Sequence, residues 1–266
     1  QLAQVQFAQK NYAEAAKLYE SLLAGKPTAD AYRGIIAVHV TQLAKSIADK
    51  PAKDQVKWSE QQQDQWQTLI KHLTSFVGSS GSVDPLGNDL AEQIFDNKRL
   101  ISELLSQCRV RLNLEVRDES RDEDPAPAES STIEPLAITA GLIAVRAQQW
   151  ENADAFFAKA LEAAGKKPAR ALEIWGMQML MGEQFERSAE VLQQAIEHPN
   201  ITNKRSFFFL LAGASAMADQ TDKALAAARK AVAAALKPSP TSNTGRGPTW
   251  STRKPTGDCA NPPSTL

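Results

Sequence analysis

A short string of residues recurs in the second half of the chain at a nearly constant interval. It begins at Trp150, Phe185 and Thr221, which are 35 and 36 residues apart, and it occurs once more near the start, at Tyr12. In each string a small residue stands three positions after the first residue, and further apolar residues follow it at helical spacing. Units of this length cannot bury their apolar faces alone, so neighbouring units must stack. The interval therefore restricts the chain to an array of similar units.

Composition and spacing predict that each unit is a pair of antiparallel helices. The chain has 42 alanine and 20 glutamine residues, both good helix formers, while β-branched runs and Asn-Gly turns are scarce. A second small residue stands nine positions before each string, where it would let the two helices approach closely. These residues are Ala3, Gly141, Gly176 and Ala212. We therefore expect an all-α chain of stacked antiparallel helical hairpins.

This pattern resembles the tetratricopeptide repeat (TPR), a helix–turn–helix unit of about 34 residues. The resemblance covers residues 2–27 and three units within 136–237, and is weakest in the last unit, where Thr221 and Ala228 replace the family's aromatic residues. It implies an α-solenoid in which the first helices of the hairpins line a concave surface. Such an array needs caps on its apolar ends, so an array that starts within a helix predicts a fragment of a longer protein.

The apolar spacing divides the chain into four parts. We expect a TPR-like unit and irregular helical hairpins in 1–114, an acidic linker or loop in 115–134, three TPR-like repeats in 135–237, and a disordered tail in 238–266. Within the first part, helices are expected over 30–48, 53–77 and 88–114.

Composition and motifs argue against several classes of function. The 30 basic and 31 acidic residues give a net charge of -1, which provides no field for nucleic acid. No apolar run is long enough for direct membrane insertion. Phosphate-binding loops, nucleophile elbows and His-Glu-x-x-His helices are missing, and Glu186 and Glu190 are expected on a solvated helical face. We therefore expect that the chain is not an enzyme.

The histidines and cysteines do not predict a metal or cofactor site. His39, His72 and His198 are scattered in the sequence without a ligand neighbour at helical spacing, so each is expected to be an ordinary helix or loop residue. Cys108 follows Leu104 and Leu105 on an apolar helical face, which favours a core residue over a nucleophile. Two cysteines are compatible with a reducing cytoplasm but do not decide the compartment.

If the resemblance holds, the first helix of each hairpin supplies residues to a peptide-binding groove. The predicted groove residues are Ile138, Leu142 and Val145, then Glu173, Met177 and Leu180, then Phe209, Gly213 and Ala216. Most are apolar, which suits an amphipathic helix or an extended apolar peptide. The lysines, arginines and asparagines with which some family members clamp acidic C-terminal peptides are not at these positions.

The expected function is therefore a non-catalytic scaffold that binds a segment of another protein. Two alternatives remain. The chain's own N-terminal helices could fill the groove, or the chain could be a regulatory or spacer segment of a larger enzyme whose catalytic domain lies outside this sequence.

Overall fold

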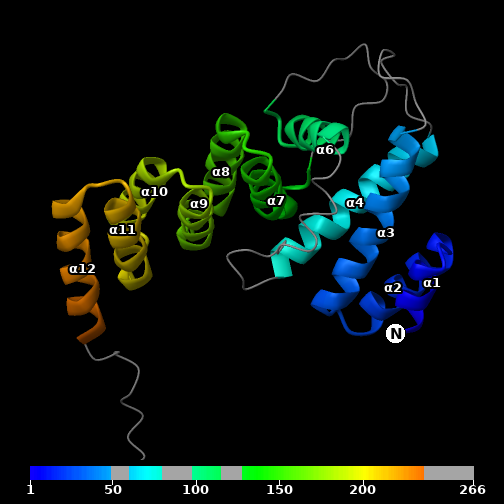
Figure 1. Cartoon of the computed structure of the whole chain (residues 1–266), viewed down its shortest axis with the longest axis horizontal. Coiled ribbons are helices and arrows are strands. Elements are labelled where there is room, and N and C mark those ends of the chain that lie inside the picture. The colour runs from blue at the N-terminus through cyan, green and yellow to red at the C-terminus, as the bar shows by residue number, and fades with distance from the viewer. Residues whose placement is uncertain (49–59, 80–97, 115–127, 237–266) are drawn as a thin grey trace, which may run out of the picture.

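Helical hairpins stack into an α-solenoid, which confirms the predicted all-α fold. The computed structural model describes residues 1–48, 60–79, 98–114 and 128–236, and every structural statement below refers to these residues. In Figure 1, α7 to α12 form a row that extends from a group made of α1 to α4 and α6. The helices are α1 (Leu2–Ala8), α2 (Tyr12–Gly25), α3 (Ala29–Ala48), α4 (Glu60–Ser79), α6 (Lys98–Arg111), α7 (Ile133–Arg146), α8 (Trp150–Ala164), α9 (Ala169–Met181), α10 (Phe185–Glu197), α11 (Arg205–Met217) and α12 (Thr221–Leu236), with a short 3-10 helix over Ser130–Thr132.

The turns inside the hairpins share one backbone conformation. A left-handed residue stands two positions before each recurring string, at Lys10, Gln148, Glu183 and Asp219, with φ between 57° and 64°. In the turn at Glu183, the next backbone N–H, that of Gln184, donates to the carbonyl of Met179 at 2.9 Å. This overlapping pattern closes the end of a helix and satisfies its last carbonyls. The repeat found in the sequence is therefore also a repeat of backbone geometry.

Small residues allow two hairpins to pack more closely than a side chain would permit. A Cβ placed on Gly141 would lie 2.8 Å from the ring of Phe157, and one on Gly176 would lie 2.6 Å from Leu192. Both distances are shorter than a carbon–carbon contact allows. The close approach that the sequence predicted at these two glycines is confirmed.

Helix α7 lies at the centre of the larger of two hydrophobic clusters. Every residue from Leu136 to Val145 is buried, because α4, α6, α8 and α9 all contact this helix. The smaller cluster is built from residues of α9 to α12 and the segment before α11. Burial therefore decreases toward α12, whose single buried residue is Ala227.

Several described helices lie where the sequence predicted helices. The helix expected over 30–48 is α3, and the described parts of those expected over 53–77 and 88–114 are α4 and α6. Residues 115–127 of the expected linker and the whole expected tail lie outside the described residues. The end of the expected linker was placed wrongly, because α7 already begins at Ile133. Pro135 lies in its first turn, where a missing N–H costs no intrahelical hydrogen bond.

Candidate functional site

The residues predicted to line a groove lie at equivalent positions of α7, α9 and α11. Ile138, Glu173 and Phe209 are 35 and 36 residues apart, and Leu142, Met177 and Gly213 follow the same intervals. Within the described residues these three sets have two different environments, because the set on α7 is buried and the sets on α9 and α11 are half-buried or exposed.

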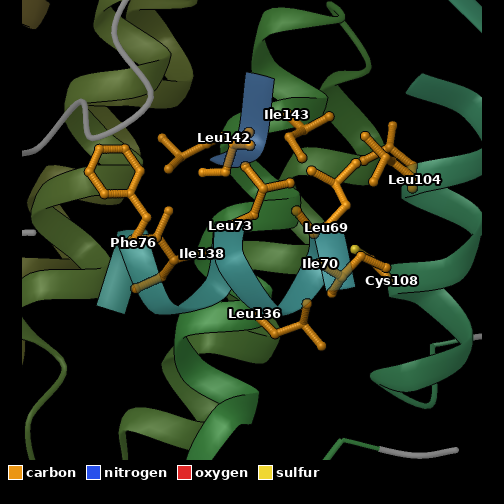
Figure 2. Packing of buried hydrophobic residues seen from close by; sticks show 14 of the residues in the cluster. Leu69, Ile70, Leu73, Phe76, Leu104, Cys108, Leu136, Ile138, Leu142 and Ile143 are labelled. Carbon is orange, nitrogen blue, oxygen red and sulfur yellow. The ribbon is translucent and has the colours of Figure 1, made fainter. Parts of the chain in front are cut away.

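The set on α7 does not line an open groove. Ile138, Leu142 and Val145 are at most 5% exposed. In Figure 2, Leu73 and Phe76 of α4 lie against the side of α7 that carries Ile138 and Leu142. The prediction that these three residues are open to a partner is therefore wrong, and a helix of the chain itself fills this part of the face.

The C-terminal end of α4 is fixed at the junction of α7 and α9. The guanidinium of Arg170, in the first turn of α9, donates a hydrogen bond to the carbonyl of Val77. This carbonyl belongs to the last turn of α4, where carbonyls have no partner within the helix. A Cβ on the neighbouring Gly78 would be 3.4 Å from Pro135 of α7. Helix α4 therefore lies along α7 and ends beside the start of α9.

On α9 and α11 the equivalent residues are only partly covered. Glu173, Met177 and Leu180 are half-buried, and Phe209 is 72% exposed. Gly213 and Ala216 are exposed on the same helix as Phe209. Sequence reasoning missed two exposed methionines at the ends of these helices, Met181 and Met217, although they are separated by the same 36-residue interval. We call Met177, Leu180, Met181, Phe209 and Met217 the open face.

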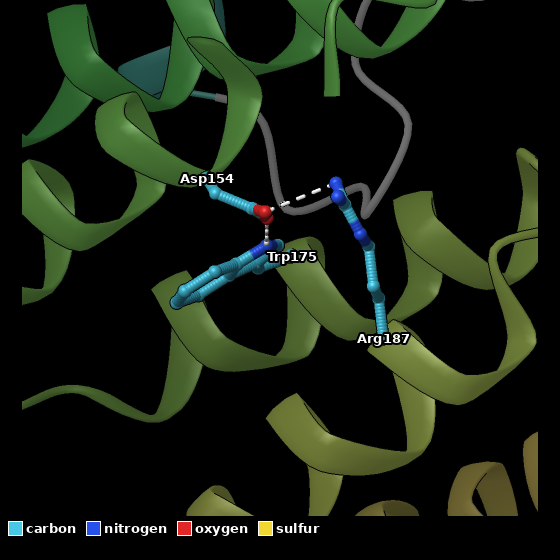
Figure 3. A network of polar contacts seen from close by, with 3 residues as sticks. All are labelled: Asp154, Trp175 and Arg187. Atoms are coloured by element: carbon cyan, nitrogen blue, oxygen red, sulfur yellow. Dashed lines mark hydrogen bonds and ion pairs between the residues drawn. The ribbon is translucent and has the colours of Figure 1, made fainter. Parts of the chain in front are cut away.

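A polar and aromatic network holds α9 between its neighbours. The ring of Phe157 in α8 stacks on Trp175 in α9, with 5.8 Å between the ring centroids. As Figure 3 shows, the Trp175 indole N–H donates to Asp154 at 3.1 Å, and Arg187 of α10 binds the other oxygen of the same carboxylate at 3.1 Å. The ion pair is partly exposed and contributes little energy by itself. The network fixes the orientation of the helix that carries Met177.

A second groove lies between α10 and α12. It has a volume of about 720 Å³, and α11 contributes Phe208 and Leu211 to its lining. Glu186 and Glu190 line it from α10, exposed as the sequence predicted, and Lys223 and Lys230 line it from α12. The Lys230 ammonium lies 5.7 Å from the centre of the Phe208 ring. The sequence spacing did not indicate this groove, because its acidic and basic lining residues come from two separate helices.

Two of the three histidines are neighbours in the structure. His39 of α3 and His72 of α4 stack with 5.7 Å between ring centroids and 12° between ring planes. Glu20 of α2 lies beside them, and one ligand atom from each of the three side chains lies within 4.8 Å of the other two. His39 and His72 are thus far apart in the sequence, as stated above, but lie together in the structure, which the sequence spacing did not indicate. His198 is separate and accepts a hydrogen bond from the backbone N–H of Asn200.

Burial keeps both imidazoles of this pair neutral. His39 is 7% exposed, and within the described part of the chain neither of its ring nitrogens has a hydrogen-bond partner. Burial, with a smaller effect of His72, lowers the pKa of His39 to about 4. Burial, with a smaller effect of Lys71, also lowers the pKa of His72. A buried polar group without a hydrogen-bond partner lowers the free energy of unfolding by about 1–3 kcal/mol, so His39 destabilises the fold in this position.

Cys108 is a core residue, as its helical face predicted. It is buried beside Leu104 and Leu105, and burial raises the pKa of its thiol to about 12. The thiolate, which is the nucleophilic form, is therefore not populated near neutral pH.

Comparisons with known proteins do not assign this chain to a family. No family model matches it, and no curated protein matches its sequence. Matching solved structures include the crystal structure of BtubC (BKLC) from P. vanneervenii, with 11% sequence identity and a TM-score of 0.34 over 99% of this chain and 100% of that chain. So low a TM-score supports no argument about function. Among the described helices, none has both the length and the apolar composition needed to cross a membrane.

Proposed function

We propose that this chain is a non-catalytic scaffold of TPR-like hairpins, and that its open face binds an apolar or amphipathic helix of another protein. The observation that carries the proposal is the position of α4. This helix of the chain itself covers Ile138 and Leu142 of α7, whereas the equivalent positions of α9 and α11 are half-buried or exposed within the part of the chain that the structure describes.

Helix α4 indicates the kind of segment that this surface accepts. Its buried residues recur at helical spacing, at Trp66, Leu69, Leu73 and Phe76, while Lys71 between them is exposed. It is therefore an amphipathic helix seated by its apolar side. Because α9 and α11 carry the equivalent positions at the same sequence interval, a partner helix with the same pattern is the segment best suited to the open face.

The side chains of the open face fit such a partner. Methionine is flexible and polarisable, so Met177, Met181 and Met217 can adapt to an apolar helix. Phe209 is the large anchor, and full burial of a phenylalanine contributes about 2 kcal/mol, or roughly a 30-fold gain in affinity. Glu173 lies beside these residues and favours a basic residue at the edge of the partner helix.

Site-specific crosslinking tests this proposal. We would place a photoreactive phenylalanine analogue at position 209 of the full chain in source cells, and at Leu225 of α12 as the control, since Leu225 is also an exposed apolar residue. We expect position 209 to crosslink an amphipathic segment of another protein and Leu225 not to. Met177→Asp should abolish that crosslink while the helical content stays unchanged.

Two results would contradict the proposal. Crosslinks from position 209 that stay within the chain would show that the open face is covered internally, which favours the spacer role. Equal products from positions 209 and 225 would show that the open face has no selectivity.

A further inference from the structure

Three side chains with metal-binding atoms converge from three consecutive helices. Glu20 ends in a carboxylate at the surface, His72 is half-buried, and His39 lies beneath them in the core. One oxygen or nitrogen atom from each lies within 4.8 Å of the other two. This arrangement is independent of the open face, because it uses only α2, α3 and α4.

From this convergence we propose that Glu20, His39 and His72 bind a divalent transition-metal ion, with Zn²⁺ as the representative ion. Two imidazoles and one carboxylate form a ligand set that zinc uses in proteins, and water or a further ligand would complete the coordination sphere. Neither the repeat pattern nor the proposed binding of a partner helix requires these three side chains to meet.

The state of His39 gives independent support. Within the described residues, both of its ring nitrogens lack a hydrogen-bond partner although the side chain is 7% exposed. Buried polar groups normally have partners, so such an exception needs an explanation. A bound ion would explain one of the two nitrogens, since it accepts the lone pair of that nitrogen, and the other nitrogen would carry the N–H.

Binding requires a small local rearrangement. Zinc lies about 2.0–2.2 Å from nitrogen and oxygen ligands, which places tetrahedral ligand atoms about 3.4 Å apart. The three ligand atoms lie within 4.8 Å of one another, so any pair near that limit must move closer together. An imidazole donates in its own plane, and the two rings are only 12° from parallel, so one ring must also turn. His72 and Glu20 are the partners with room to move, because neither side chain is fully buried.

The ligand set also predicts selectivity. Imidazole favours zinc, copper, nickel and cobalt, whereas Mg²⁺ and Ca²⁺ prefer oxygen ligands. We therefore expect Zn²⁺ and Co²⁺ to bind in the presence of excess Mg²⁺. Bound Co²⁺ should show the visible absorption of a cobalt ion with nitrogen ligands.

The test is a calorimetric titration of Zn²⁺ into the chelator-treated full chain. All proteins carry Cys259→Ser, because a free thiolate would also bind zinc. We expect one ion per chain, and Glu20→Gln and His72→Gln should each weaken binding at least tenfold. His198→Gln and Glu14→Gln are matched controls, since they remove a histidine outside the cluster and another carboxylate of α2.

The measured affinities distinguish a site at Glu20, His39 and His72 from zinc binding elsewhere. Weaker binding only in the two cluster variants, with loss of the Co²⁺ absorption, would support the site. Absence of zinc binding by the parent chain would overturn the proposal. So would equal affinities of the cluster and control variants, because another group would then hold the ion.

Discussion

Replacement of Gly141 with alanine should destabilise the protein, although alanine is the better helix former. Gly141 lies in the middle of α7, where helix propensity alone would favour alanine by about 1 kcal/mol. The new Cβ, however, would lie 2.8 Å from the ring of Phe157. That ring is fully buried and stacks on Trp175, so it has little space into which to move.

The two effects can be compared in magnitude. Overpacking a buried site costs about 1–3 kcal/mol, and the confined ring places this site in the upper part of that range. After the gain in propensity is subtracted, Gly141→Ala should lower the free energy of unfolding by about 1–2 kcal/mol. The control is Gly213→Ala in the middle of α11, where a Cβ would meet nothing within 4 Å. There the gain in propensity stands alone, and stability should rise by about 1 kcal/mol.

Urea denaturation followed by far-ultraviolet circular dichroism measures both changes. Because repeat arrays can unfold in parts, tryptophan fluorescence provides a second probe, since Trp175 stacks on Phe157, the ring that the new Cβ would meet. The cause is tested in a Phe157→Leu background, in which Gly141→Ala should cost at least 1 kcal/mol less. A Gly141→Ala protein as stable as the parent would refute the steric argument, and so would an equal cost in both backgrounds.

Three further changes test other parts of the structure. Leu142→Asp should prevent folding, because a buried carboxylate would cost more than about 4 kcal/mol. Phe209→Asp, at an exposed position, should change the free energy of unfolding by less than about 0.5 kcal/mol. Thermal denaturation compares the two proteins, and equal melting temperatures would contradict the expected difference. Glu183→Gly should raise the free energy of unfolding by about 1 kcal/mol, because φ is 60° at this residue and glycine adopts that conformation without strain. Glu190→Gly within α10 should lower the free energy of unfolding by a similar amount. Urea denaturation should show these two changes with opposite signs. In a Cys259→Ser chain, Cys108 should resist iodoacetamide at mildly alkaline pH until urea unfolds the protein, because burial raises the thiol pKa to about 12. Mass spectrometry measures the labelling, and rapid labelling of the folded protein would contradict this prediction.

The features that could be predicted from the sequence are those that repeat at a fixed interval. Gly141 and Gly176 were identified by their distance from the recurring string, and the left-handed residues Gln148 and Glu183 mark the same turns. Periodicity works here because each hairpin makes the same contacts within itself. The buried position of Cys108 followed in the same way from the apolar spacing of a single helix.

The environment of each groove position could not be predicted in this way. Leu142 and Met177 occupy equivalent places, yet one is buried and the other is half-exposed. The difference comes from α4, which belongs to a part of the chain without the repeat spacing. A periodic pattern shows which residues are equivalent, but it does not show which of them another helix covers.

The histidine cluster was missed for a related reason. His39 and His72 are 33 residues apart and Glu20 is 19 residues before His39, so no local spacing connects the three. They meet only because α2 packs against α3 and α3 packs against α4, which brings the three side chains together. Three-ligand sites of this kind become visible only when tertiary packing is known.

Helix α4 takes part both in the histidine cluster and in the covered part of the solenoid face. One side of this helix carries Leu73 and Phe76 against α7, and the same helix carries His72 against His39 of α3. A metal ion held by residues of α2, α3 and α4 would restrain α4 in the position that covers Ile138 and Leu142. Ion binding would then stabilise the internally covered part of the solenoid face and leave the open face on α9 and α11 available to a partner.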